Sequence, residues 1–413
     1  DSAFNYITTH ESYADGGSKF YDKSALYHLH GEYKFTPRFM NITVGANYRT
    51  YRPNSHGTIF SDTNGVKITN WEYGAYAGLE KRFLDSLLKI NATLRMDKNE
   101  NFDVLFSPAV SAVYTLNKSS FRASFSSAIR NPTLTDQYLY YNVGPALLVG
   151  NLNGFDSLVT LPSLFDNINT QNYDTLVFFN VKPIRPEQVK SIEVGYRASL
   201  FQHLFLDMSY YYSWYRYFIG YKLGAVIDDN DIIKRLNGFD VYRVAANTED
   251  EVTTTGFSIG LNYYFKDYFS INGNYSYNKL NLQGSTDPIV PAFNTPENKF
   301  NVGISGRDIS INIGFLNKIW KKLPVIPFNN YGFSINYKWV EGFLYEGSPQ
   351  FTGEVPTYGK VDAQINKVVP KIDMTVKIGA SNLLNNMKFE VYGGPYVGRM
   401  AYVQVLFDLN GKN

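Results

Sequence analysis

The sequence lacks several features that mark common classes of protein. None of its 413 residues is cysteine, which excludes disulfides, thiolate metal sites and cysteine nucleophiles. Its mean hydropathy is −0.26, and no run is long and apolar enough for a transmembrane helix. The net charge is only +2 and no basic run is present, which argues against a nucleic-acid partner.

Catalytic signatures are missing as well. There is no H-E-x-x-H motif, since His10-Glu11 lacks a second histidine, and there is no G-x-S-x-G elbow or phosphate-binding glycine loop. No Pro/Ser linker or low-complexity run divides the chain. Its first residues resemble the interior of a longer chain more than a signal peptide. We therefore predict one domain, no enzyme activity and no cofactor.

What the sequence does contain is long alternation of apolar and polar residues. Between 192 and 200 the even positions are apolar or aromatic and the odd positions are polar or small, and 206–214 repeats the pattern. Successive side chains of a strand point to opposite faces. Strands of soluble sandwiches usually run only about five or six residues. Strands of about ten residues suit a sheet that spans a bilayer.

Aromatic residues support a membrane sheet. They make up 16% of the chain, with 34 Tyr and 30 Phe, as expected for aromatic girdles at both interfaces. The polar face includes lysine and arginine, which cost roughly 2–4 kcal/mol each when they face lipid at the midplane. These charges must face a wet or plugged interior. The predicted fold class is therefore all-β: a wide transmembrane antiparallel β-barrel.

We predict about 15–16 strands, with ends uncertain by a few residues. Short turns alternate with long connections, an arrangement in which the long loops lie outside the cell and the chain ends on the periplasmic side. The connection 310–329 is too long for a periplasmic turn and has no interpretation. The predicted strands are 23–35, 39–51, 67–83, 86–97, 102–116, 119–131, 186–200, 204–222, 252–266, 268–280, 298–309, 330–345, 357–369, 373–384 and 399–409, with the end of a sixteenth at 3–8.

Four segments carry a resemblance to a known family. Residues 121–139 contain a strand that ends in Arg-x-Pro and continues into acidic and aromatic residues. Residues 183–196 resemble the pattern L-x-P-E-x-x-x-x-x-E-x-G, and 379–386 resemble the ending N-L-x-D/N-x of a penultimate strand. Residues 392–399 are similar to a last loop before a last strand. In this order the segments resemble the barrel of TonB-dependent outer-membrane receptors, of the Bacteroidetes type.

The resemblance implies a barrel of roughly 22 strands filled by an N-terminal plug. Residues 1–413 would be the C-terminal portion of that barrel, without the plug and the first strands. It also implies a location in the bacterial outer membrane, contact with its lipid, and TonB-driven import of a scarce bulky solute, such as a ferric chelate. The remaining strands and the plug would close the open sheet edges. A porin-like passive channel, or a structural or adhesive subunit of a larger complex, stays open as an alternative.

The connection 132–185 is the best candidate for ligand recognition, because exposed aromatics on a loop of a rigid scaffold often bind ligands. An equally weighted alternative is that the loop folds over itself and buries those rings. Sugars, peptides and planar cofactors remain possible cargo beside a metal chelate. The proposed contacts are Tyr138, Tyr140, Tyr141 and Arg130.

Three further groups are weaker candidates. His28, His30 and Glu32 share one face of the first strand and could hold a metal, although a polar wall is the more common role for such a group. Residues 97–103 resemble a calcium loop but have Phe102 where glycine is required, so a hairpin tip is favoured. The acidic loop 223–251 is interpreted as a solvated loop or as one that bridges to lipopolysaccharide through cations, with a ligand role as the less favoured alternative.

Overall fold

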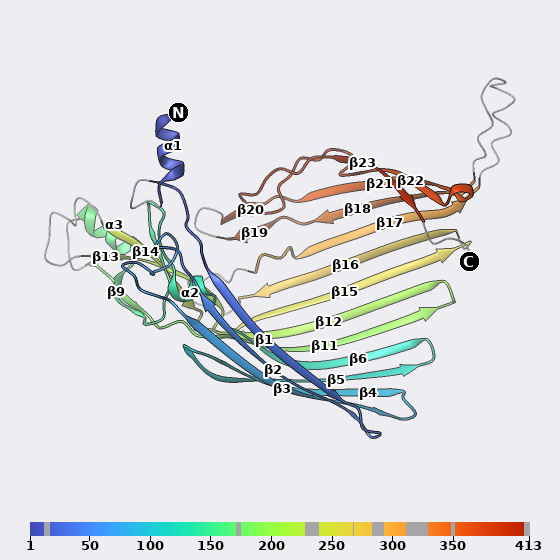
Figure 1. The fold of residues 1–413 in the computed structure, drawn as a ribbon, viewed down its shortest axis with the longest axis horizontal. Coiled ribbons are helices and arrows are strands. Elements are labelled where there is room, and N and C mark those ends of the chain that lie inside the picture. The colour runs from blue at the N-terminus through green and yellow to red at the C-terminus, as the bar shows by residue number, and fades with distance from the viewer. Residues whose placement is uncertain are drawn as a thin grey trace.

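One large sheet dominates the molecule (Figure 1). The computed structural model describes residues 1–11, 17–170, 175–227, 239–266, 268–282, 293–310, 329–347 and 352–408. The sheet has 15 strands, all antiparallel to their neighbours and paired in chain order. They are β1 (Ala25–Phe35), β2 (Asn41–Arg52), β3 (Asn70–Phe83), β4 (Leu88–Asn99), β5 (Phe102–Leu116), β6 (Ser119–Arg130), β11 (Glu187–Leu200), β12 (Leu204–Arg216), β15 (Val252–Phe265), β16 (Phe269–Asn281), β17 (Asn298–Ile309), β18 (Tyr331–Val340), β21 (Tyr358–Val369), β22 (Met374–Ser381) and β23 (Met400–Phe407).

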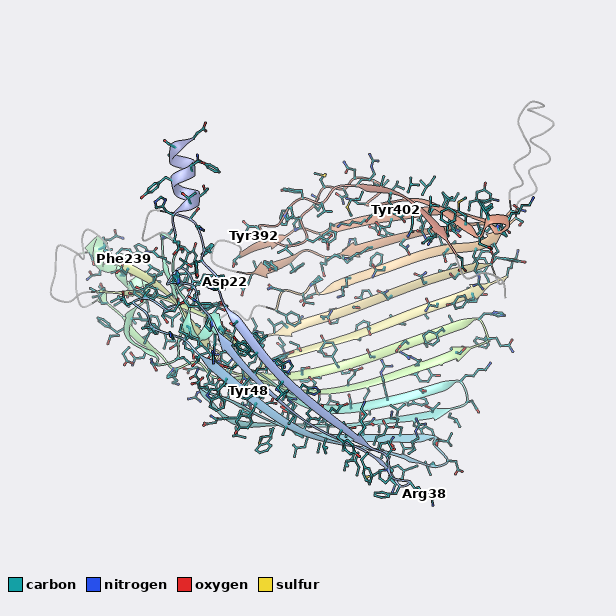
Figure 2. All side chains as sticks on the ribbon, in the orientation of Figure 1. Asp22, Arg38, Tyr48, Phe239, Tyr392 and Tyr402 are labelled. Atoms are coloured by element: carbon teal, nitrogen blue, oxygen red, sulfur yellow. The ribbon has the colours of Figure 1, made fainter. Side chains whose placement is uncertain are left out.

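The sheet curves into a trough with long connections at one end of the strands and short turns at the other (Figure 1). Asp22 marks the loop end of β1, and Arg38 lies in the turn between β1 and β2 (Figure 2). In the described part of the chain, β1 and β23 form the two edges of this sheet and each has one neighbour. No helix in that part is long and apolar enough to cross a membrane.

The pairing register confirms the predicted alternation. A continuous row of apolar and aromatic partners crosses eight strands on one face, which we call the outward face. Many large apolar side chains on this face are exposed, as a lipid-facing surface requires. The row consists of Tyr114, Phe121, Tyr196, Met208, Ile259, Tyr275, Phe300 and Trp339.

The opposite, inward face carries ion pairs. Asp207 of β12 lies between two arginines: Arg122 Nη1 donates to Oδ1 at 3.0 Å and Arg197 Nε donates to Oδ2 at 2.9 Å. Because both cations are paired on the face away from the apolar row, no lipid-facing charge results. The two faces of the sheet therefore suit two different solvents.

A second sheet forms from the two longest connections, 131–186 and 217–251. We call it the loop sheet, and its six strands pair in the order β10-β9-β13-β14-β8-β7. Its buried side chains include Leu158, Val159 and Val244. Its elements are α2 (Leu134–Tyr138), β7 (Tyr140–Asn142), β8 (Leu147–Val149), β9 (Phe155–Val159), α3 (Leu161–Thr170), β10 (Phe178–Val181), β13 (Ile219–Val226) and β14 (Asp240–Asn247).

The boundaries of three predicted strands were wrong because the chain leaves the main sheet earlier. The strand predicted at 204–222 ends at Arg216, where Tyr217 adopts φ 57° and redirects the chain into the loop sheet. The strand predicted at 330–345 ends at Val340, after which β19 (Phe343–Glu346) pairs with β20 (Thr352–Val355) as a separate hairpin. The strand predicted at 373–384 ends at Ser381, because Asn382 adopts φ 50°.

The sixteenth strand expected at 3–8 was also wrong. This segment is the helix α1 (Ser2–Thr9), in which Asn5 N donates to Asp1 O at 3.0 Å. In the described structure no strand pairs with this segment, so its backbone N–H and C=O groups form hydrogen bonds within the helix. The connection 310–329, almost entirely, and the acidic residues Asp228, Asp229 and Asp231 lie outside the described residues.

Candidate functional site at the loop end of the sheet

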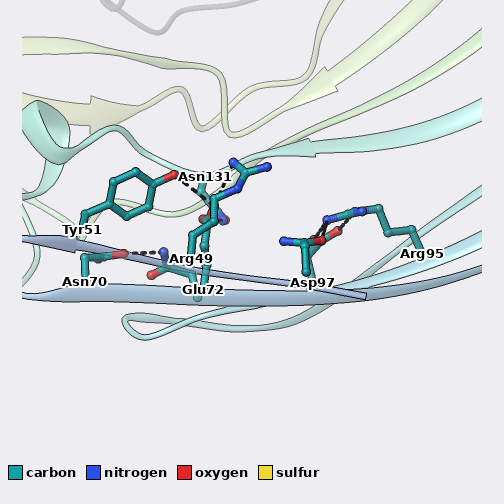
Figure 3. Close-up of polar contacts among 9 residues, drawn as sticks. Arg49, Tyr51, Asn70, Glu72, Arg95, Asp97 and Asn131 are labelled. Carbon is teal, nitrogen blue, oxygen red and sulfur yellow. Dashed lines mark hydrogen bonds and ion pairs between the residues drawn. The ribbon is translucent and has the colours of Figure 1, made fainter. Parts of the chain in front are cut away.

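A polar network on the inward face joins the strands to the connection 131–186 (Figure 3). Glu72 of β3 is its centre: Oε1 accepts from Arg49 Nη1 and from the Tyr51 hydroxyl, both at 3.2 Å, and Oε2 accepts from Asn131 Nδ2 at 3.4 Å. Nearby, Arg95 binds the Asp97 carboxylate through two nitrogens. The hydrogen bonds of Glu72 hold the start of this connection against the inward face of the main sheet.

Amide side chains anchor the helix α2. Gln137 Oε1 accepts from Asn70 Nδ2 at 3.0 Å and from Asn101 Nδ2 at 2.8 Å. Asn99 Nδ2 donates to Asn70 Oδ1 at 2.8 Å, and both asparagines are buried. Because Asn99 and Asn101 serve this network at the tip of the β4–β5 hairpin, the hairpin interpretation of residues 97–103 holds.

A large cavity opens between the loop sheet and the β19–β20 hairpin. We call it the mouth cavity; its volume is about 900 Å³. Side chains from α2, the ends of β6, β11 and β12, the strands β13 and β14, and the hairpin line it. Its charged and phenolic lining side chains are Arg130, Asp136, Glu187, Tyr215, Tyr221, Arg243 and Glu346.

Arg243 is the central cation of the mouth cavity. Its guanidinium carbon lies 3.5 Å from the ring centre of Tyr221, within the range of a cation–π contact. No ion pair within 4.0 Å joins Arg243 to a carboxylate of the described residues. Burial lowers the pKa of Arg243, although the charges of Tyr221, Glu346 and Asp136 oppose that effect. Arg243 therefore presents a cation with spare donors to the cavity.

The acidic groups of the cavity differ in their environments. Burial raises the pKa of Glu346, and the charge of Arg243 only partly counteracts it. Asp136 is buried and accepts from the backbone N–H and the hydroxyl of Thr133, both at 2.8 Å, in the capping box of α2. Burial, with the nearby charge of Asp136, also raises the pKa of Tyr221. The phenol thus stays neutral beside the guanidinium.

Arg130 has a partner of its own. Its Nη2 donates to Glu187 Oε2 at 2.7 Å, and the same oxygen accepts from the backbone N–H of Ile219 at 3.2 Å. Arg130 comes from the Arg-x-Pro segment and Glu187 from the Pro-Glu segment of the resemblance. The structure therefore brings two separate sequence motifs together at the floor of the mouth cavity.

The predicted ligand residues do not share one cavity. Tyr138 and Tyr140 line a different space, the outer cavity, with a volume of about 560 Å³, whereas Arg130 lines the mouth cavity. Tyr141 packs against Phe20, with ring centres 5.3 Å apart. The hydroxyl of Tyr138 accepts from Asn101 Nδ2 at 2.6 Å, so this ring also anchors α2.

The aromatic loop buries some of its apolar residues and exposes others, and its role in ligand recognition stays a prediction. Its apolar residues Leu148 and Leu158 are buried within the loop sheet, whereas Tyr140 and Phe178 are exposed. Tyr173 lies outside the described residues. Sequence reasoning missed Tyr221, Arg243 and Glu346. These residues sit in three separate segments, and only the packing of two connections and a hairpin brings them together.

The candidate metal residues of β1 form a hydrogen-bonded group instead. The Tyr76 hydroxyl donates to Glu32 Oε2 at 2.7 Å and lies 3.2 Å from His30 Nε2. Lys34 pairs with Glu32 at 3.3 Å, and the rings of His28 and His30 lie 6.4 Å apart. Within the described ranges, no group of three or more His, Asp or Glu side chains could hold a metal ion.

Several solved structures of receptors and transporters are similar to this fold. The siderophore receptor PirA from Acinetobacter baumannii is 14% identical, with a TM-score of 0.59 over 96% of this chain and 57% of that chain. The FrpB iron transporter from Neisseria meningitidis is 12% identical, with a TM-score of 0.60 over 92% and 55%. A mutant ferric enterobactin receptor, PfeA, from Pseudomonas aeruginosa in complex with enterobactin is 13% identical, with a TM-score of 0.62 over 92% and 54%.

These likenesses show the fold, and the chain spans a little over half the length of each solved structure. None of the curated proteins compared with it matches the chain. The sequence profile described as "TonB dependent receptor-like, beta-barrel" matches residues 1–383. The chain therefore belongs to the TonB-dependent receptor family, and residues 1–383 match the family's outer-membrane β-barrel.

Proposed function

We propose that this barrel imports a bulky solute, a ferric chelate or a similar compound, which binds first in the mouth cavity. The single observation that carries the proposal is the cavity itself. It measures about 900 Å³ and is built from two loops and a hairpin that are far apart in sequence. The printed names of the similar structures, siderophore receptors and an iron transporter, support a metal chelate as cargo.

The chemistry of the cavity suits a solute with anionic oxygens and flat groups. Glu187 already neutralises Arg130, whereas Arg243 contacts the face of Tyr221 and retains its guanidinium donors. A guanidinium can bind chelating or carboxylate oxygens in a bidentate manner. The ring of Tyr221 and the partly buried Glu346 would bound the solute on two sides.

We propose that strands outside this chain pair with the edges β1 and β23, and that a plug and the TonB complex supply the energy for import. The argument for closure is physical. An unsatisfied backbone group costs several kcal/mol in hydrocarbon, and an open edge exposes a whole row of such groups. The plug and the dependence on TonB follow from the family.

The test uses the full-length receptor in cells grown under iron limitation. Arg243→Ala removes the cation with spare donors and should weaken binding of its ferric chelate about tenfold or more. The matched control is Lys182→Ala, because Lys182 pairs with Glu249 just beyond the ends of β10 and β14 but lies outside the mouth cavity. Equal uptake by both variants would remove the mouth cavity from the proposal.

The alternatives predict different results. A porin-like channel would pass small solutes without TonB, so uptake that survives deletion of TonB contradicts the receptor. A structural or adhesive subunit would show no ligand-dependent uptake and would copurify with a partner protein. Induction by a glycan or a peptide, and not by iron limitation, would overturn the ferric chelate.

The sequence-based candidates remain part of the proposal. Tyr140 lines the outer cavity and is exposed, so it can contact a solute before the mouth cavity does. Tyr138, Tyr141 and Arg130 are already engaged by Asn101, Phe20 and Glu187. We expect Tyr140→Ala to weaken binding more than Tyr141→Phe, with the barrel folded in both variants.

A further inference from the structure

The charged groups that line the mouth cavity are more acidic than basic. Two guanidinium groups, of Arg130 and Arg243, share the cavity with three carboxyl groups, of Asp136, Glu187 and Glu346, and the described lining contains no lysine or histidine. Like charges repel more strongly in a partly buried site than in water, so a solute with anionic groups only would be opposed here. The groups that a solute can use are those without a partner in the protein.

Three of these five groups already serve contacts within the protein. Arg130 Nη2 donates to Glu187 Oε2 at 2.7 Å, and Glu187 is buried. Asp136 is also buried, and its carboxylate accepts from the backbone N–H and the hydroxyl of Thr133. The side chains that remain for a solute are those of Arg243 and Glu346.

Arg243 and Glu346 are opposite charges that share one cavity without pairing. Neither belongs to an ion pair among the described residues. Burial raises the pKa of Glu346, and the charge of Arg243 only partly opposes that effect. Both side chains are half-buried. Because a charge that is partly removed from water is unfavourable without a partner, each of them can gain from a solute group of opposite sign.

Separate elements fix the positions of these two charges. Asn294 clamps the backbone of Glu346 on β19: its Nδ2 donates to Glu346 O at 2.9 Å, and its Oδ1 accepts from Glu346 N at 2.7 Å. Arg243 lies on β14 of the loop sheet, with its guanidinium carbon 3.5 Å from the ring centre of Tyr221. The cavity therefore offers a cation and an anion at preformed places, which lowers the cost of ordering them on binding.

The rest of the described lining is uncharged. It includes the apolar side chains of Phe218, Leu223 and Phe293. The cavity measures about 900 Å³, which leaves room for a bulky solute. Binding sites of this kind commonly hold the body of a ligand on apolar surface and orient it through a few polar groups.

We infer that the mouth cavity selects a zwitterionic solute, which places an oxyanion at Arg243 and a protonated amine at Glu346. The inference rests on the proposed function, because it takes the mouth cavity as the place where the imported solute binds. A guanidinium can hold both oxygens of a carboxylate, and an ammonium group donates to a carboxylate in a charge-assisted hydrogen bond. Each unpaired charge of the cavity then has a partner. A solute without the amine leaves Glu346 unpaired.

The experiment measures the binding of four ferric trihydroxamate chelates to the full-length receptor in detergent. Three hydroxamate anions balance Fe³⁺ in each chelate, so the four differ only in their side groups. One has a carboxylate and an amine, one has the amine acetylated, one has the carboxylate converted to an amide, and one has both changes. The wild type should bind the zwitterionic chelate about tenfold more tightly than the acetylated one, because the contact of the ammonium with Glu346 is lost.

Two variants of similar shape assign the preference to its residues. Glu346→Gln should bind the zwitterionic chelate about tenfold more weakly and the acetylated chelate at least as tightly as the wild type. Arg243→Gln should weaken only the chelates that have a carboxylate. The control is Glu249→Gln, which removes a carboxylate that pairs with Lys182 outside the mouth cavity and should leave all four affinities unchanged. Thermal unfolding verifies that the variants are folded, and the comparison of chelates on the wild type needs no variant.

The outcomes separate this inference from the proposed function. A preference of the wild type for the zwitterionic chelate that disappears in Glu346→Gln supports the inference. Equal affinity of the wild type for all four chelates, a preference that survives in Glu346→Gln, or an equal loss in Glu249→Gln overturns it. The mouth cavity then remains the proposed binding site as long as Arg243→Ala still reduces uptake. Binding of none of the four chelates by the wild type overturns this inference together with the ferric chelate.

Discussion

The main sheet exposes large apolar side chains along its whole outward face, whereas the loop sheet encloses a core of buried ones. Val194 in β11 and Tyr210 in β12 are roughly half exposed, yet Val159 and Val244 of the loop sheet are fully buried. The first arrangement is stable where lipid covers the outward face, and the second needs only its own core. The molecule thus combines a membrane wall with a water-facing unit that folds on itself.

The largest effect should come from the core of the loop sheet. Leu158 is 1% exposed, and Leu158→Ala leaves a cavity that costs about 2–5 kcal/mol in a packed interior. We expect the loop sheet to lose protection while the main sheet keeps it. Limited proteolysis and hydrogen exchange of the full-length receptor would report the difference. Simultaneous loss of protection in β11 and β12 would contradict two separate units.

A charge introduced on the outward face of the main sheet tests whether lipid covers that face. Val194→Arg places a cation against lipid and should destabilise the barrel by roughly 2–4 kcal/mol. Ser124→Arg, one strand away on the inward face beside Glu193, should change stability by less than about 1 kcal/mol. Guanidinium unfolding in lipid vesicles measures both. Equal costs for the two variants would mean that the faces are not distinct.

The loop 53–69 tests whether a connection can be rigid without a hydrophobic core. Asp62→Ala removes three hydrogen bonds and should cost about 1–3 kcal/mol of local stability. Because folding lowers the pKa of Asp62, its contribution is present at neutral pH. It is lost as the pH falls below about 4. Hydrogen exchange in this loop should rise at low pH in the wild type and show no such step in the variant.

The smallest effect concerns the hairpin over the mouth cavity. Burial raises the pKa of Glu346, so the folded state holds its proton more tightly than the unfolded state. The stability of the hairpin should therefore fall as the pH rises between the two pKa values. Glu346→Gln should remove this step and stabilise the β19–β20 hairpin by under about 1 kcal/mol at pH 7. A steeper pH dependence in the variant would contradict the assignment.

The main sheet could be predicted from the sequence, because each of its strands has its own alternation of apolar and polar residues. Ile192 and Val194 point one way and Glu193 the other, whatever else the chain does. Strand ends were harder to predict: Tyr217 and Asn382 stop their strands through a left-handed backbone that no alternation signals. Predicting 3–8 as a strand failed because alternation alone does not supply a partner strand.

The candidate site was predicted only in part. Arg130 could be found because it lies in a recognisable segment, and it does line the mouth cavity. Arg243 and Glu346 had no sequence signal, because they meet across a distance of about a hundred residues through folded loops. Tyr138 stays a predicted ligand contact: its ring lines the outer cavity, and its hydroxyl accepts a hydrogen bond from Asn101.

The central claim is that the outward face of the 15-stranded sheet contacts lipid. The chain has no cysteine, so a single introduced cysteine in this part of the receptor carries a spin label at a defined place. Labels at Tyr196 and Ile271 should be reached by oxygen dissolved in the bilayer, and a label at the inward Asn272 by a water-soluble relaxation agent. Water contact at Tyr196 or Ile271 would contradict the account.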